Sequence, residues 1–183
     1  MYSLLLTIIY AAFISLGLPD SLLGSGWPAI YPELGVSLSY AGIVSTLISV
    51  GTVISSLLSD RLTKKYGAGM ITALSVLSTA VALFGFSVSP SFLWLCVFAL
   101  PYGLGAGAVD AALNNYVALH YSSRHMSWLH AFWGVGVSVS PCIMSFCLSN
   151  NLGWQDGYRI VSVAQLVLTA IIYLSLPIWK RRE

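Results

Sequence analysis

Six long apolar segments, separated by short polar ones, decide what this sequence can fold into. A helix needs about 20 mostly apolar residues to cross the hydrocarbon core of a bilayer, and each segment is about that long or longer. We predict spans over residues 3–30, 39–62, 69–88, 91–119, 127–148 and 158–179. Charged residues make up 8% of the chain, against roughly 25% in soluble domains. The sequence therefore predicts an all-α polytopic membrane protein, with the first and fourth spans long enough to tilt or curve.

The basic residues are distributed unevenly between the two ends of such a bundle. Seven of the eight fall at the end that also holds both termini: Arg61, Lys64, Lys65, Arg124, Lys180, Arg181 and Arg182. Arg159 falls at the other end, beside Asp156, where we expect a surface ion pair of little energetic value. The positive-inside rule then predicts cytoplasmic N and C termini. We expect a multi-pass protein of the plasma (inner) membrane.

Three of the ionisable side chains that lie away from the ends of the predicted spans could serve function, namely Asp20, Asp110 and His130. A charge at the centre of a spanning helix costs about 2.5–3.5 kcal/mol or more, and such residues usually face a cavity. Asp20 follows Pro19 and, in an unbroken helix, would share a face with Gly24 and Trp27. The alternative for Asp20 is a structural role, in which its carboxylate satisfies the backbone that Pro19 frees.

The fourth span carries small and polar residues at helical spacing: Gly103, Gly107, Asp110 and Asn114. Glycines at this spacing are typical of a close helix–helix interface, which explains the two glycines better than it explains the acid. Asn115 lies about 100° around the helix from Asn114, so the two amides cannot share one narrow face. We expect one of the two amides to bond a neighbouring helix.

In the fifth span, His130 and Trp133 share a face. His130 could be an interhelical hydrogen-bond donor, or it could bind a solute or relay a proton. Trp133 and Trp27 could each offer a flat face to a sugar ring, although Trp27 also suits an interfacial anchor. Trp154 and Trp179 are predicted to be interfacial anchors.

Two motifs carry a family resemblance. The segment between the second and third spans reads Ser56-Leu-Leu-Ser-Asp60-Arg61-Leu-Thr63-Lys64-Lys65. It resembles the signature Gly-x-x-x-Asp-Arg-x-Gly-Arg-Arg/Lys of the major facilitator superfamily, with Ser56 and Thr63 in place of glycine. Gly136-Val-Ser-Val-Ser140-Pro141 is similar to the Gly-x-x-x-Gly-Pro motif of the same family.

The resemblance implies the N-terminal six-helix half of that fold, built from two inverted three-helix repeats over about residues 1–88 and 89–183. "GLPDSLLGSG" in the first span aligns with "ALPYGLGAGA" in the fourth, and "GTVISS" in the second with "GVSVSP" in the fifth. The resemblance also implies that Asp60 and Arg61, with Lys64 and Lys65, latch this half to a second half at the cytoplasmic face. Alternatively, these charges are solvated and serve orientation alone.

Within the superfamily, the intramembrane residues are similar to those of the fucose-permease branch, which moves sugars with protons. The resemblance implies proton-coupling acids at Asp20 and Asp110 and an amide partner at Asn114. It places His130 where that branch has an amide. We therefore predict a solute site made of seven residues: Asp20, Asp110, Asn114, Asn115, His130, Trp133 and Trp27. Burial favours the neutral form of a carboxyl group, and acids and amides both suit the hydroxyl groups of a polyol.

The predicted function is proton-coupled symport of a small polar solute, with a sugar favoured. The alternatives are export of amphipathic compounds by proton antiport and a non-transporting, half-size assembly partner. The sequence holds no pattern of an enzyme, a metal cluster or a nucleic-acid-binding surface, and it implies no cofactor. The coupling ion would be a proton, with sodium left open. The expected partners are the lipid bilayer, the solute and a second six-helix half, supplied by a continuation of the chain or by a homodimer.

Overall fold

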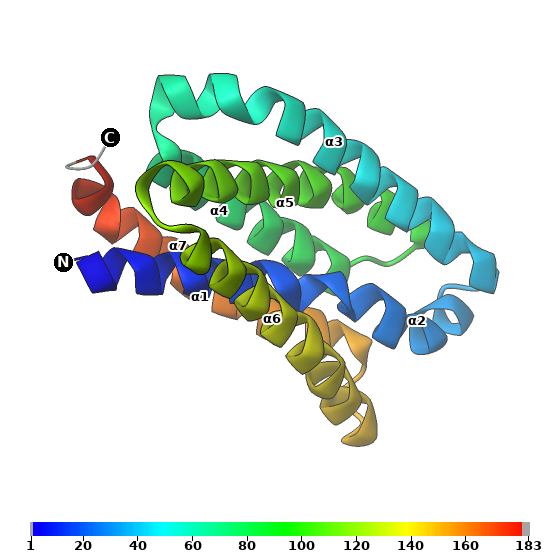
Figure 1. The fold of residues 1–183 in the computed structure, drawn as a ribbon. Helices are drawn as coiled ribbons and strands as arrows, with labels where there is room; N and C mark the ends of the chain where they lie inside the picture. The colour runs from blue at the N-terminus through cyan, green and yellow to red at the C-terminus, as the bar shows by residue number, and fades with distance from the viewer. Residues whose placement is uncertain (1, 181–183) are drawn as a thin grey trace.

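A computed structural model describes residues 2–180, and these residues form a helical bundle without a strand (Figure 1). The helices are α1 (Tyr2–Asp20), α2 (Leu22–Glu33), the 3₁₀ turn η1 (Leu38–Tyr40), α3 (Ala41–Tyr66), α4 (Ala68–Ser87), α5 (Phe92–His120), α6 (Ser123–Ser149) and α7 (Trp154–Lys180). Six spans in this part of the chain are long and apolar enough to cross a membrane. The predicted fold class is confirmed.

Most helices extend beyond the ends that hydrophobicity predicts. The α3 helix runs to Tyr66, through the segment that was expected to be a basic loop, and α6 begins at Ser123 instead of residue 127. Hydrophobicity marks only the part of a helix inside the hydrocarbon, and the backbone stays helical in the interfacial layer. Lys64 and Lys65 lie in the last turn of α3, where positive charge stabilises the end of a helix. Unusual length is therefore not confined to the first and fourth spans, because every span except that of α4 has 26–30 residues.

The first span is broken at Ser21, between α1 and α2. Pro19 has no N–H, and its ring displaces the carbonyl of Ser15, the residue four positions earlier. The amide of Gln165 in α7 donates to that Ser15 carbonyl at 2.8 Å. The alternative, structural role for Asp20, in which its carboxylate satisfies this freed backbone, is therefore wrong, because the Gln165 amide binds the Ser15 carbonyl.

The break also separates Asp20 from Trp27. Asp20 is exposed, whereas Trp27 is buried and donates from Nε1 to the carbonyl of Leu38 at 2.8 Å. The expected common face of these two residues is wrong, because it assumed an unbroken helix.

Two helix pairs, α1–α6 and α3–α5, pack closely through glycines. A side chain at Gly51 of α3 would meet the Leu100 carbonyl oxygen of α5, because a Cβ placed there lies 2.8 Å from that oxygen. A side chain at Gly136 of α6 would meet the Ile14 carbonyl of α1 in the same way. Gly103 and Gly107 of α5 lie against the backbone of α3, as the small-residue interface predicts.

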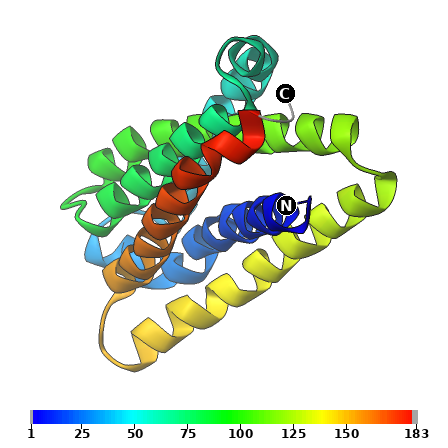
Figure 2. The ribbon, with the colours of Figure 1, turned by 90° about the vertical axis from the view of Figure 1, so that its left-hand side faces the viewer.

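The α4 and α7 helices pack against each other behind the two pairs and join them (Figure 2). The two predicted repeats match α1 with α5, α3 with α6, and α4 with α7. Under this match the α1–α6 pair corresponds to the α5–α3 pair, and the α4–α7 pair corresponds to itself. The pairing supports two inverted repeats, over about residues 1–88 and 89–183, and this division stays a prediction.

The start of α1 and the last turns of α7 lie at the same end of the bundle (Figures 1 and 2). The α3–α4 and α5–α6 connections lie at the same end (Figure 1). Asp156 and Arg159 form a 2.8 Å surface ion pair near the start of α7. Arg181, Arg182 and Glu183 lie outside the described residues, as does the side chain of Lys180. The cytoplasmic location of this end stays a prediction.

Trp154 and Trp179 are core residues, and their prediction as interfacial anchors is wrong. Each is 1% exposed. The Trp154 indole donates to Glu33 at 2.7 Å, which ties the end of α2 to the start of α7. Trp179 packs on Gly69 and donates to the Ser175 hydroxyl at 3.0 Å. Their position near the ends of a span suggested anchoring, but it did not reveal which neighbours would cover them.

We predict that Gly103→Ala separates α3 from α5 and lowers the free energy of unfolding by about 1–3 kcal/mol, the usual cost of overpacking. The matched control is Gly134→Ala in α6, where a Cβ meets nothing within 4 Å. Thermal unfolding in detergent measures both variants. A Gly103→Ala variant as stable as the Gly134→Ala variant would show that the glycine contact does not hold the pair together.

Candidate functional site

A cavity of about 310 Å³ lies between the two helix pairs. Four helices line it, with Phe13, Leu16 and Asp20 from α1, Ile48 and Thr52 from α3, Tyr102, Ala106 and Asp110 from α5, and His130 and Trp133 from α6. Its volume falls at the lower end of the range for small-molecule sites, about 300–1,000 Å³. The cavity therefore brings together four of the seven predicted solute-site residues: Asp20, Asp110, His130 and Trp133.

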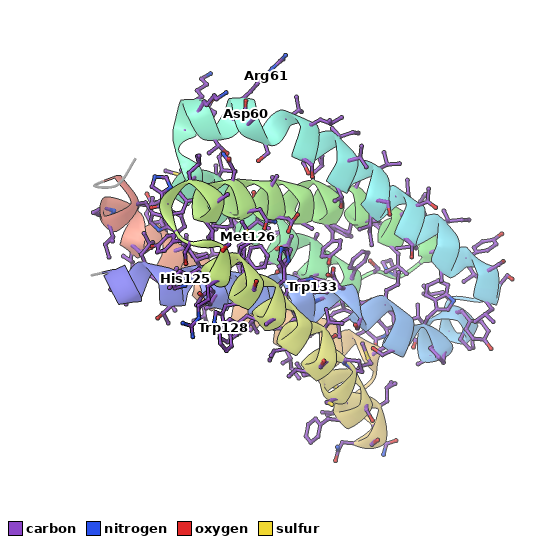
Figure 3. All side chains as sticks on the ribbon, in the orientation of Figure 1. Asp60, Arg61, His125, Met126, Trp128 and Trp133 are labelled. Carbon is purple, nitrogen blue, oxygen red and sulfur yellow. The ribbon has the colours of Figure 1, made fainter. Side chains whose placement is uncertain are left out.

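Asp20 connects three helices across this cavity. One carboxylate oxygen accepts a hydrogen bond from the Tyr102 hydroxyl of α5 at 3.0 Å, and the other accepts one from the Trp133 indole of α6 at 2.9 Å. Figure 3 shows Trp133 between α6 and the helices α1 and α5. Asp20 thus lies at the break in the first span with both oxygens oriented by neighbouring helices. We call Asp20, Tyr102 and Trp133 the Asp20 cluster.

Tyr102 is a site residue that the sequence analysis missed. Its ring is buried and packs against Phe86 of α4 at a centroid distance of 6.3 Å. A signal was present, because the alignment of Pro19 with Pro101 places Tyr102 opposite Asp20. The two residues that correspond in the predicted repeats are therefore hydrogen-bonded to each other.

Asp110 is half-buried and has a different set of neighbours. One of its oxygens accepts a hydrogen bond from the Asn114 amide, one turn along α5, at 3.0 Å. His130 lines the same cavity as Asp110, and its ring and the Phe13 ring meet in a T-shaped arrangement with their centroids 6.0 Å apart. Among residues 4–179, no hydrogen bond joins His130 to a neighbouring helix, so its interpretation as an interhelical donor gains no support. We call Asp110, Asn114 and His130 the Asp110 cluster.

The other predicted site residues lie elsewhere. Asn114 supports Asp110 without lining the cavity, and Trp27 is buried under the η1 turn. Asn115 is exposed and lines a second cavity of about 630 Å³ at the end of α3. The expectation that one amide bonds a neighbouring helix is wrong within the described residues, since Asn114 bonds its own helix and no hydrogen bond is found at the Asn115 side chain.

The four predicted latch residues gather at the same end of α3. Asp60, Lys64 and Lys65 line the second cavity, while Arg61 points away from the bundle (Figure 3). Asp60 and Lys64 form an ion pair at 2.7 Å in which both side chains are more than half exposed. An exposed pair of this kind contributes at most about 1 kcal/mol to stability. These charges are therefore accessible to a partner at this end of the bundle.

The 310 Å³ cavity between the two helix pairs, which we call the central cavity, has a distinctive set of charged side chains. Its lining includes two carboxylates and one imidazole, and within residues 4–179 no lysine or arginine lines it. Apolar and aromatic side chains supply most of the remaining surface, from Phe13, Leu16, Ile48 and Tyr102. Such a site offers hydrogen-bond acceptors and flat apolar faces to a ligand, and it offers no permanent positive charge.

A comparison with protein families agrees with this architecture. The family model described as Major Facilitator Superfamily matches residues 9–182. The chain belongs to the major facilitator superfamily. This membership supports the six-helix half of a transporter fold that the sequence motifs predict.

Three curated relatives in this superfamily show how broad the similarity is. The niacin transporter NiaP of Acinetobacter baylyi is 23% identical over 72% of this chain and 31% of its own length. An uncharacterised transporter of Bacillus subtilis is 26% identical over 91% of this chain and 42% of its own length. A putative glycerol-3-phosphate transporter of Arabidopsis thaliana is 28% identical over 75% of this chain and 28% of its own length. The chain thus matches less than half the length of each of these relatives.

We predict that the central cavity admits water. In a background where the three native cysteines are replaced by alanine, Thr52→Cys should react with a membrane-impermeant thiosulfonate. Thr52 lines the cavity, and a cysteine in contact with water ionises to the reactive thiolate more easily than a buried one. The matched control is Thr72→Cys in α4, since Thr72 is fully buried. Mass spectrometry measures the modified fraction. Equal labelling of the two variants would contradict a water-filled cavity at Thr52.

Proposed function

We propose that this chain forms the solute-binding half of a secondary transporter that moves a small, neutral, polar solute together with protons by alternating access. A sugar is the favoured solute. The observation that carries the proposal is a cavity with two carboxylates and a histidine but no lysine or arginine within the described residues. Carboxylates accept hydrogen bonds from hydroxyl groups, and the Trp133 face suits the apolar side of a sugar ring.

The charge of the cavity favours a neutral solute over an anion. Relatives named for niacin, muconate and glycerol 3-phosphate act on solutes that carry a carboxylate or a phosphate group. A second negative charge beside Asp20 and Asp110 would be repelled in a low-dielectric cavity, and His130 is the lining residue that could offset it. A polyol avoids this repulsion. The resemblance to the fucose-permease branch points to the same class of solute.

Proton coupling follows from the same acids. A carboxyl group in a cavity that opens alternately to two compartments can take up a proton on one side and release it on the other. Asp110 and Asp20 are the two acids that line the cavity, and we propose both as coupling residues, with Asp110 first. Alternating exposure would come from movement of this half against a second half.

A second candidate function rests on the apolar part of the lining. Phe13, Leu16, Ile48 and Trp133 could hold an amphipathic compound, which the protein would export in exchange for protons. The two candidates differ in the direction of transport and in the solute that competes for the cavity.

A partner unit completes the proposal. Asp20 and His130 are exposed in the single six-helix bundle, and a bilayer would not solvate them. We propose that a second six-helix half covers this side and that Asp60 and Arg61, supported by Lys64 and Lys65, contact it at the cytoplasmic face of the plasma membrane. The second half would be either a continuation of the chain or a second copy.

We predict that Asp110→Asn lowers proton-driven accumulation of L-fucose by about tenfold or more, because the amide cannot carry a proton. Counterflow exchange without a proton gradient should persist. Uptake of labelled L-fucose into proteoliposomes measures both, with D-galactose, niacin and glycerol 3-phosphate as competitors, and a sodium gradient as a separate arm. Asp156→Asn is the matched control, since Asp156 forms a surface pair with Arg159.

Several outcomes would contradict this proposal. Full proton-driven uptake in both Asp110→Asn and Asp20→Asn would exclude the coupling mechanism. Competition by niacin or glycerol 3-phosphate without competition by sugars would exclude a neutral solute. Proton-driven efflux of an amphipathic dye would favour the second candidate function, and uptake driven by sodium alone would replace the coupling ion.

We also predict that residues 1–183, expressed by themselves, form a dimer in membranes. A lysine-reactive crosslinker should give a product of twice 19.7 kDa, because Lys64 and Lys65 are exposed at the proposed contact. Gel electrophoresis after crosslinking in native membranes measures the product. A chain that transports L-fucose but crosslinks only as a monomer would overturn the requirement for a second copy.

A further inference from the structure

The central cavity has two polar clusters at different depths. Tyr102 of the Asp20 cluster and Asp110 of the Asp110 cluster both belong to α5 and are eight residues apart, which is about 12 Å along the helix. Ala106 lies between them and lines the cavity. A solute that spans this distance would meet the two clusters with different parts of its surface.

The donors of the Asp20 cluster are already used within it. A tyrosine hydroxyl and an indole each have one hydrogen to donate. Tyr102 and Trp133 both donate to Asp20, one to each carboxylate oxygen. Asp20 keeps unused lone pairs, but its two oxygens are already oriented, and neither Tyr102 nor Trp133 has a hydrogen left to donate to a solute oxygen.

The Asp110 cluster has more unused capacity. Among residues 4–179, the hydrogen bond found at the Asp110 carboxylate is the one from Asn114 to Oδ1, and none is found at either His130 ring nitrogen. Both side chains line the cavity. An acceptor and a ring that can donate or accept therefore face the same space, which suits a solute hydroxyl.

We propose that Tyr102 is a positioning residue that fixes the Asp20 carboxylate and, through it, the Trp133 ring, and that the hydroxyl groups of the solute are recognised at Asp110 and His130 instead of at Asp20. The proposal rests on the proposed function. In this arrangement Asp20 holds the Trp133 ring, which presents a fixed apolar face to the solute. The Asp110 cluster forms hydrogen bonds with the hydroxyl groups of the solute.

The packing of Tyr102 gives a reason for a positioning role. Its ring is 4% exposed and lies against Phe86, which in turn packs on Tyr158 at a centroid distance of 5.4 Å. A side chain held in this way has few alternative rotamers, so its hydroxyl defines one place for the Asp20 oxygen. Tyr158 belongs to the same aromatic group and makes no hydrogen bond to Asp20, which makes it a matched control.

The first experiment needs no solute. The fluorescence of Trp133 is isolated as the difference between each protein and its Trp133→Phe counterpart, and acrylamide quenching measures the access of water to the ring. Tyr102→Phe should increase quenching of Trp133, while Tyr158→Phe should leave it unchanged. In an Asp20→Ala background, Tyr102→Phe should add no further change, because its effect passes through Asp20.

The second experiment uses L-fucose as the probe and separates KM from kcat for counterflow exchange in proteoliposomes without a proton gradient, so that loss of a coupling acid does not itself change the readout. Asp110→Ala and His130→Ala should each raise KM by about tenfold or more, the range for loss of a hydrogen bond to a charged group. Tyr102→Phe should raise KM by about three- to tenfold and should have no effect in the Asp20→Ala background. The Tyr158→Phe variant should keep the KM of the wild type.

The results separate this proposal from the proposed function. An effect of Tyr102→Phe that is the same with and without Asp20, on quenching or on KM, would overturn the positioning role. A larger KM effect of Asp20→Ala than of Asp110→Ala would overturn recognition at the Asp110 cluster. If the wild type neither binds nor transports L-fucose or D-galactose, the proposed function fails together with recognition at Asp110. The quenching experiment still decides the positioning role in that case.

Discussion

The hydrogen bond from Gln165 to the Ser15 carbonyl is the interaction on which the arrangement of the site depends. Pro19 prevents this carbonyl from bonding within α1, and an unsatisfied carbonyl in the membrane interior would be costly. Gln165 of α7 satisfies it at 2.8 Å and accepts a hydrogen bond from Thr79 of α4, also at 2.8 Å. One buried amide therefore joins three helices at the level where the first span breaks. This amide supports the break, and Asp20 is the last residue of α1 before it.

The glycine contacts determine where the cavity forms. Gly136 lets α6 approach α1, and Gly51 and Gly103 let α3 approach α5, so four of the six spans form two tight pairs. The α4 and α7 helices join these pairs from behind, which leaves a space between them. Small residues are effective in this role because lipid offers no hydrophobic force for helix association, and close backbone packing replaces it. The four cavity helices are thus the helices of the two glycine-mediated pairs.

Much of the fold was predictable from local features. Apolar length gave the six spans, and the family motifs around Asp60 and Gly136 indicated half of a larger fold. The intramembrane acids indicated a cavity, and Asp20 and Asp110 do line one. The predictions that are wrong concern relative rotation and burial. Trp27 was placed with Asp20 because the break at Ser21 was not foreseen, and Trp154 and Trp179 were placed at the interface because their covering neighbours are distant in sequence. Tyr102 was missed because a tyrosine in an apolar helix costs little and draws no attention by itself, and its signal lay only in the alignment of the two repeats, which places it opposite Asp20.

The sequence by itself determined the membrane class, the number of spans and the presence of costly polar groups inside them. These properties follow from composition and from the length of the apolar segments, to which each residue contributes independently of its neighbours in the fold. Only the tertiary structure decided which polar groups meet. Asp20 is 82 residues from Tyr102 and 113 from Trp133, and their hydrogen bonds depend on how three helices rotate and cross. Those rotations are fixed by the glycine contacts and by the break at Pro19, which are cooperative properties of the whole bundle.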